Sequence, residues 1–199
     1  SDMKIPVGDG NVIFPEGLAY INDNAFEGCT GLEKINFDLN NIHISEYAFE
    51  NNTTLQEIVM KDWVYYIGEG AFKNCKSLTK VVIPSTVTNI SEAVFRGCES
   101  MKSIRVEPKN KYYKSEPNKR EGTDHVLFNK NKSILIAYPA SSREIQYEIP
   151  DSVTVVSDWA FCECKKLNRI TIPDSVHEIG EGAFCNCMLL DEVEIPDSV

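Results

Sequence analysis

The sequence predicts a mainly β solenoid, in which short parallel strands and helical turns recur along one axis. The first observation is a period of 23 residues between phenylalanines, with one gap of 66 residues before the last two: Phe26, Phe49, Phe72, Phe95, Phe161 and Phe184. The second is that four apolar columns keep the same step; they start at Ile21, Leu32, Ile35 and Phe37. One unit of this size has too little apolar surface to fold alone, so stacked units must share a core.

Each unit divides into three pieces, which are clearest in the copy that starts at Leu78. Apolar and outward residues alternate at the end of Leu78–Ile83, which predicts a short strand. Pro84 ends that strand because proline cannot donate to a ladder. Val87–Ile90 predicts a second extended segment, and Ser91–Cys98 predicts about one helical turn. The period falls within the range of leucine-rich repeats.

An acidic residue stands three positions before every phenylalanine of the period, at Asp23, Glu46, Glu69, Glu92, Asp158 and Glu181. The residue before it is Asn, Ser or Gly, all of which suit a helix N-cap. An acid in the first turn would also interact favourably with the helix dipole. Calcium binding is the alternative, but one carboxylate per coil supplies few of the oxygen ligands that calcium takes.

The cysteines follow the same period. Seven is an odd number, so the chain cannot pair all of them internally. Five lie three residues after a phenylalanine, where the second copy has Asn52. A small, weakly polar side chain at this position would fit a tight buried corner and could hydrogen-bond the backbone there. Cys162 and Cys185 fall in a column of charged residues and are expected to face solvent. A disulfide between them is disfavoured by a strand spacing of about 5 Å, and a zinc clamp by the alternating directions of Cys-x-Cys.

Residues 107–148 interrupt the regular repeats of 12–106 and 149–199. Val126–Phe128 and Ile134–Tyr138 flank an Asn- and Lys-rich turn and predict a β-hairpin. The interruption is therefore interpreted as modified coils within one domain, residues 1–199. The segment 109–132 has seven Lys or Arg against three acids, and it is the one basic patch of the sequence.

Composition and motifs exclude several classes of function. Acids outnumber bases by 30 to 20, which argues against a general nucleic-acid-binding role. No apolar run approaches the roughly 20 residues of a membrane span, so membrane insertion is not expected. His43, His125 and His177 fall in unrelated columns, and no hydrolase, metalloprotease or phosphate-loop motif is present. We expect no enzyme, no cofactor and no metal site.

Because the chain stops in mid-unit at Val199, we expect a fragment of a longer array, or an open edge that self-associates.

The residues of one copy, Ile172–Cys187, resemble the consensus of BspA-like leucine-rich repeats, also called the Treponema pallidum type. The stretch from Tyr112 to Pro139 is similar to the hairpin-bearing coil of that family, although Asp124-His125 replaces its usual Asp-Gly. The resemblance covers roughly Val12 to Val199. It implies a right-handed solenoid on a secreted or cell-surface protein. The N-terminus, Ser1–Lys4, has no apolar stretch like that of a signal peptide, so we expect that either the chain is intracellular or a leader was removed. It also implies adhesion to host proteins, matrix or other cells; the alternative is a passive spacer that presents a neighbouring domain.

The outward positions of the main strand are the candidate ligand face, because they vary while their inward neighbours do not. The candidate residues are Val59, Val82, Arg105 and Thr171, with Tyr112 and Tyr113 following in the variant coil. Exposed aromatic and Arg side chains beside an apolar pair are typical of interface anchors. We expect a weak protein or glycan contact centred on Val82, Arg105 and Tyr113, with the basic loop Lys109–Arg120 as the alternative site.

Overall fold

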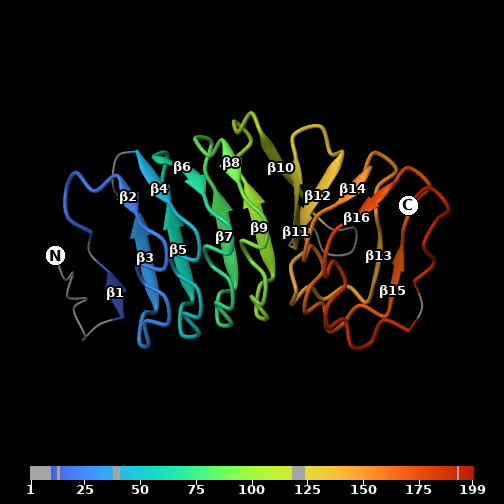
Figure 1. Ribbon diagram of the computed structural model, residues 1–199, viewed down its shortest axis with the longest axis horizontal. Helices are drawn as coiled ribbons and strands as arrows, with labels where there is room; N and C mark the ends of the chain where they lie inside the picture. Colours follow the sequence, from blue (N-terminus) through green and yellow to red (C-terminus); the bar gives the residue numbers. More distant parts are fainter. Residues whose placement is uncertain (1–9, 13, 38–40, 118–123, 192) are drawn as a thin grey trace.

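The computed structural model describes residues 10–12, 14–37, 41–117, 124–191 and 193–199. Its coils lie side by side along the longest axis, with the two ends of the chain at opposite ends of the molecule (Figure 1). Within those ranges all regular elements are strands, and none is a helix. No helix that could span a membrane is found there either. The predicted solenoid is confirmed.

The main sheet runs parallel through the first five coils. Its strands, in sheet order, are β1 (Asn11–Val12), β3 (Lys34–Phe37), β5 (Glu57–Met60), β7 (Lys80–Ile83) and β9 (Ser103–Val106). Inward residues pair with their counterparts 23 positions on, as Ile35 does with Ile58. After the interruption the same position is taken by β13 (Gln146–Glu148) and β15 (Arg169–Thr171), which also pair in parallel. The apolar columns of the sequence therefore become the inner side of this sheet.

A second parallel sheet forms another side of the solenoid. In the first half it contains β2 (Tyr20–Ile21), β4 (Ile42–Ile44), β6 (Val64–Ile67) and β8 (Asn89–Ile90). In the second half the corresponding strands are β14 (Val155–Val156) and β16 (Glu178–Ile179). These are the second extended segments that the alternation predicted.

The third side consists of successive turns, so the predicted helical turns are wrong. Two residues of each of the six regular coils have a positive φ, one directly after the acidic residue and one two positions after the phenylalanine. The first set is Asn24, Tyr47, Gly70, Ala93, Trp159 and Gly182, and the second is Gly28, Asn51, Asn74, Gly97, Glu163 and Asn186. Because left-handed residues cannot continue a right-handed helix, each turn is broken twice. The acidic column consequently caps no helix, and the dipole explanation for it falls away.

The left-handed residues turn backbone amides toward the next coil. The amide of Phe26 donates to the carbonyl of Ala48 at 2.8 Å, and those of Phe49 and Phe72 donate in the same way to Ala71 and Val94. The amides of both left-handed columns do likewise between regular coils. This third ladder links neighbouring coils where a helix would have bonded only within itself.

Stacked phenylalanines fill the interior beneath the turns. Ring centroids are 5.1 Å apart between Phe26 and Phe49 and 5.5 Å apart between Phe49 and Phe72, with nearly parallel planes. Tyr138 continues the stack in the second half, 5.0 Å from Phe161. The neighbouring polar column behaves as predicted: the Cys75 thiol and the Asn52 amide donate to the phenylalanine carbonyls of the preceding coils.

All seven cysteines are free thiols. Cys162, predicted to face solvent with Cys185, is instead buried, and Cys185 is half-buried. Cys162 is covered because it lies at the interruption, in a cavity wall to which Arg96 and Trp159 also belong. Burial, followed by the neighbouring Cys185, raises the pKa of Cys162 to about 12.

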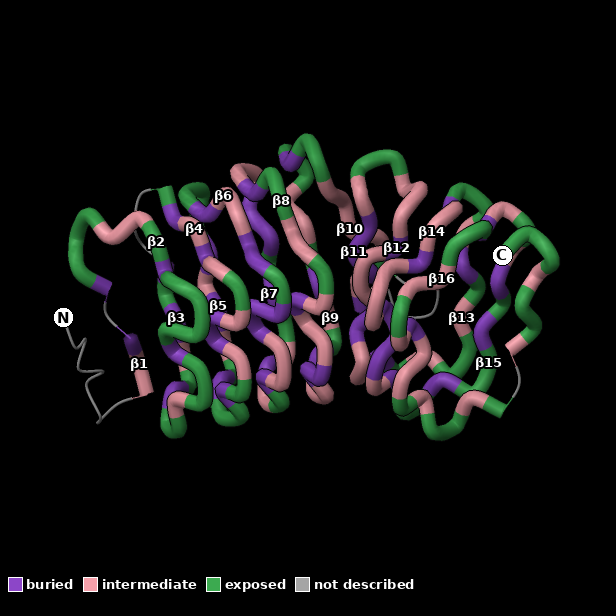
Figure 2. The backbone as a smooth tube through the Cα atoms, viewed as in Figure 1, coloured by how far each residue is buried: buried purple, intermediate pink, exposed green. Residues whose placement is uncertain are grey.

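The interruption contains the predicted hairpin. β11 (His125–Asn129) pairs antiparallel with β12 (Ile134–Ala137) and, on its other side, with β10 (Tyr113–Pro117). Among the described residues the buried apolar side chains form two clusters, and β11 contributes to both. Leu127 belongs to the first cluster, whereas Val126 and Phe128 belong to the second. Figure 2 shows buried and more exposed segments alternating along the chain in both halves.

Candidate functional site

The predicted ligand residues of the main strands lie on the outer face of the main sheet. Val82 is 43% exposed and pairs with the exposed Arg105 on the next strand. Val59 is half-buried on β5, and Thr171 is exposed on β15, beyond the interruption. The structure therefore brings Val82 and Arg105 together and leaves Thr171 in the other half.

The two tyrosines of the predicted face lie elsewhere. The Tyr113 hydroxyl accepts a hydrogen bond from the Ile90 amide at 2.8 Å, which places Tyr113 beside the second sheet. Its partial burial raises the pKa of its hydroxyl. Tyr112 is exposed, and both tyrosines line a cavity at the interruption. Val82, Arg105 and Tyr113 thus belong to two surfaces. Residues 118–120 of the alternative basic loop, Lys109–Arg120, lie outside the described residues.

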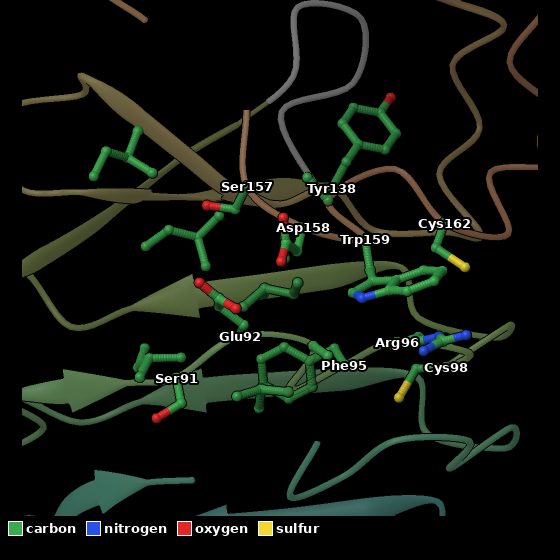
Figure 3. A pocket seen from close by; sticks show the side chains of 18 of the residues that line it. Ser91, Glu92, Phe95, Arg96, Cys98, Tyr138, Ser157, Asp158, Trp159 and Cys162 are labelled. Carbon is green, nitrogen blue, oxygen red and sulfur yellow. The ribbon is translucent and has the colours of Figure 1, made fainter. Parts of the chain in front are cut away.

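That cavity separates the last regular coil before the interruption from the first regular coil after it. Its volume is about 350 Å³, and its walls are largely apolar, with Ile90, Phe95, Met101 and Tyr138 among them. In Figure 3 the Arg96 side chain lies against the Trp159 ring beside this opening, and the guanidinium carbon is 3.3 Å from the ring centroid. The two halves of the stack therefore touch through long side chains across a partly open interior.

The turn ladder stops at this cavity. In the regular coils the amides equivalent to Ala93 and Phe95 donate to carbonyls of the next coil, but these two have no backbone acceptor among the described residues. Both residues line the cavity. The cavity thus combines apolar walls with a polar edge.

Charged side chains bridge the same gap. The Lys165 ammonium lies 2.7 Å from the Glu99 carboxylate, which also pairs with Lys76 at 2.9 Å. Hydrogen bonds from Lys165 and Lys76 lower the pKa of Glu99. Glu92 and Asp158 face each other in Figure 3, and the negative charge of Asp158 raises the pKa of Glu92. Across the cavity the two halves are therefore attracted by the ion pairs of Glu99 and repelled by the carboxylates of Glu92 and Asp158.

A row of aromatic side chains on the second sheet was not found from the sequence. The outward positions of β2, β4 and β6 are Tyr20, His43 and Tyr66, in direct register. The ring centroids of His43 and Tyr66 are 4.1 Å apart with an interplanar angle of 4°, and those of Tyr20 and His43 are 5.2 Å apart. The signal was available, because these residues stand directly before the isoleucine column at the 23-residue step.

The carboxylate and thiol columns do not assemble a metal site. Across the ranges that the structure describes, no three His, Cys, Asp or Glu residues come together in a way that could hold a metal ion.

Comparison with known proteins gives the same architecture. The model of the BspA-type leucine-rich-repeat region matches residues 10–118 and 138–199, with six copies. A leucine-rich repeat protein from Eubacterium ventriosum is similar at 28% identity and a TM-score of 0.74, over 96% of this chain. The pneumococcal vaccine antigen PcpA matches at 23% identity and a TM-score of 0.75, also over 96% of this chain. A leucine-rich cell surface protein from Faecalibacterium prausnitzii matches at 24% identity and a TM-score of 0.69, over 90% of this chain.

This chain spans 55%, 51% and 59% of the length of those three structures, in the same order. A comparison with curated proteins gave no significant match. The family model covers most of the sequence, on both sides of the hairpin, and the repeat unit that it describes is the coil seen in the structure. The chain therefore belongs to the BspA-type leucine-rich-repeat family.

Proposed function

We propose that this chain is a protein-interaction module of a secreted or cell-surface protein and that it mediates adhesion to host proteins, matrix or other cells. The repeats of its family form scaffolds for protein interaction. One neighbour is described as a cell surface protein, and the name is said of that protein. A repeat scaffold offers a continuous outer surface with side chains that can change without disturbing the core.

The observation that carries this proposal is the outer row of the main sheet. Val82 and Arg105 are exposed and adjacent, and the residue at this position changes along the row from Asn36 through Val59 and Val82 to Arg105 and Thr171. An apolar side chain next to a guanidinium is a pair that contributes well to interfaces. Inward residues at the same strands are buried, so the outer pair contributes little to the fold. Val59 and Thr171 on the same outer face remain candidate contacts, and Tyr112 and Tyr113 remain candidates at the cavity.

The test is a binding panel of immobilised extracellular-matrix proteins and glycans, measured by biolayer interferometry. The proposal expects at least one surface to bind the wild-type chain and to bind a Val82→Asp/Arg105→Ala variant about tenfold more weakly. A matched control is Asn36→Ala, which changes an exposed residue of the same row two coils earlier. Equal binding of the double variant and the wild type, with the fold intact, would move the contact to another surface.

The alternative function is a passive spacer that holds a neighbouring domain away from a cell surface. The elongated stack of coils in Figure 1 would suit that role. A spacer binds none of the panel, whereas an adhesive module binds at least one member reproducibly.

A further inference from the structure

The second sheet of the first half carries an exposed aromatic row beside a row of acids. The aromatic row consists of Tyr20, His43 and Tyr66 on β2, β4 and β6. Tyr20 is 59% exposed, and Trp63, just before β6, is 51% exposed. Outward positions of a sheet that faces water are normally polar, so this concentration of exposed rings indicates a binding surface.

A β-bulge enlarges the aromatic row at its third coil. Ile42 pairs with Val64 but His43 pairs with Tyr66, so Tyr65 is an additional residue on β6. Val64 and Ile67 point into the core, and both tyrosines between them are half-buried on the outside. His43 contacts both rings, at 5.7 Å from Tyr65 and 4.1 Å from Tyr66. Bulges of this kind often redirect side chains at functional surfaces.

Three residues beyond each member of this row stands an acid. These acids are Asp23, Glu46 and Glu69, and Glu92 follows Asn89 in the next coil; all four are exposed. Three residues of chain span at most about 10 Å, so these acids lie within reach of the ring row, at the start of the adjoining turns. The Tyr66 hydroxyl lies 3.2 Å from the hydroxyl of Ser91, next to Glu92, which shows that the ring row extends toward the acids.

The acids of this face have no basic counterpart. The sequences 19–24, 42–47, 63–70 and 86–93 contain no Lys or Arg. Among the described residues, none of these four acids takes part in an ion pair. Elsewhere on the same coils acids are paired, as Glu57 is with Lys34 at 2.9 Å and Glu50 with Lys73 at 2.8 Å. The aromatic face is thus bordered by uncompensated negative charge.

We propose that this aromatic–acidic face binds a basic polypeptide segment, with Arg or Lys side chains of the partner seated on the rings and paired with the carboxylates. Rings attract cations through their π faces, and guanidinium groups also stack on them. The chain itself already makes contacts of this kind, such as those of Lys73 over the Tyr47 ring at 5.3 Å and Arg96 over the Trp159 ring at 3.3 Å. The surface is distinct from the outer row of Val82 and Arg105, so this proposal and the proposed adhesive function can fail separately.

The test uses a fluorescently labelled peptide of six arginines separated by serines, titrated with the whole chain at about 0.15 M salt. At that ionic strength charges are screened over about 8 Å, which suppresses attraction by the net negative charge alone. A peptide with citrulline in place of arginine keeps the shape and removes the charge. The expected result is measurable binding of the arginine peptide and at least tenfold weaker binding of the citrulline peptide.

Two variants with matched controls separate the contributions of rings and acids. Tyr20→Ala/Tyr66→Ala should weaken binding about fivefold, whereas Met188→Ala/Leu189→Ala, which removes two exposed apolar side chains outside the row, should change it less than about twofold. Glu46→Gln/Glu69→Gln should weaken binding more than Glu27→Gln/Glu57→Gln, which removes the same charge from other faces. Circular dichroism and melting curves verify that the variants are folded.

Three outcomes would overturn this proposal. The first is that the wild-type chain fails to bind the arginine peptide, or binds the citrulline peptide equally well. The second is that the tyrosine variant binds as the wild type does, which would leave only general charge attraction. The third is that a neutral oligosaccharide binds in a Tyr66-dependent manner while the arginine peptide does not, which would make the face a glycan site.

Discussion

The guanidinium carbon of Arg96 lies 3.3 Å from the centroid of the Trp159 ring. Arg96 belongs to the last regular coil before the interruption, and Trp159 to the first regular coil after it. In a regular stack these coils would be joined by the turn ladder, but the amides of Ala93 and Phe95 find no backbone acceptor there. The Arg96–Trp159 contact therefore joins the two halves on the side where the backbone does not.

A double-mutant cycle tests that contact. Arg96→Ala, Trp159→Ala and the double variant should give a coupling free energy of about 1 kcal/mol in urea unfolding, since half-buried cation–π pairs are of that order. Lys73→Ala with Tyr47→Ala is the matched cycle inside a regular coil stack, where the ladder is complete. A coupling indistinguishable from zero for Arg96 and Trp159 would mean that the contact contributes nothing to joining the halves.

The phenylalanine stack should be most sensitive at its centre. Phe72 is fully buried between Phe49 and Phe95, so Phe72→Ala should lower the free energy of unfolding by about 3–5 kcal/mol. Phe95→Ala is the internal comparison and should cost less, because Phe95 is half-buried and lines the cavity. Chemical denaturation measures both. A cost for Phe72→Ala below about 1 kcal/mol would contradict the stacked core.

The two halves should unfold together, as the sequence predicts for a single domain of residues 1–199. The strand β11 buries Leu127 in the first apolar cluster and Phe128 in the second, which couples them. The chain has two tryptophans, and Trp63 lies in the first half while Trp159 lies in the second. Trp63→Phe and Trp159→Phe variants each leave one fluorescent reporter. Coincident melting curves are expected; two separated transitions would show two domains.

Stability should respond to pH through Glu92. The negative charge of Asp158 raises the pKa of Glu92 in the folded state above its usual value. A raised folded-state pKa means that the native state binds the proton more tightly, so this group costs stability as pH rises through that range. Glu92→Gln should therefore melt at a higher temperature than the wild type at pH 7 and lose that advantage in acid, below the usual range of glutamate. The difference should shrink in 1 M salt. A variant that is no more stable at pH 7 would contradict the repulsion.

Much of the fold could be predicted because a solenoid repeats the same physical problem in every coil. The columns of Ile21 and Ile35 identified both sheets, and the hairpin of Val126–Phe128 with Ile134–Tyr138 was confirmed. The turns could not be predicted in the same way. Asn, Tyr, Gly, Ala and Trp all adopt a positive φ in one column, so residue type gave no warning of the left-handed conformation.

The surfaces were harder to predict than the core. The 23-residue step continues into the interruption, where the Asn110 amide donates to the carbonyl of Val87 and Tyr113 lies beside Ile90. Tyr113 was therefore predicted on the wrong surface. It was expected beside the outward residues of the main sheet, but it begins β10 and lies beside Ile90 of the second sheet. The aromatic row was not predicted because its members occupy outward positions, one residue before each buried isoleucine, and Tyr65 joins the row only through a β-bulge.

Retention of coated beads under flow measures directly whether this solenoid functions by binding. Beads coated with the wild-type chain are passed over epithelial cells and over immobilised matrix proteins, beside uncoated beads. A further set carries a variant with Val82→Asp, Arg105→Ala, Tyr20→Ala and Tyr66→Ala together. Wild-type beads are expected to be retained severalfold more than uncoated beads on at least one surface, and the variant is expected to lose most of this retention. Retention equal to that of uncoated beads on every surface would show that the solenoid does not bind them and would favour a passive spacer.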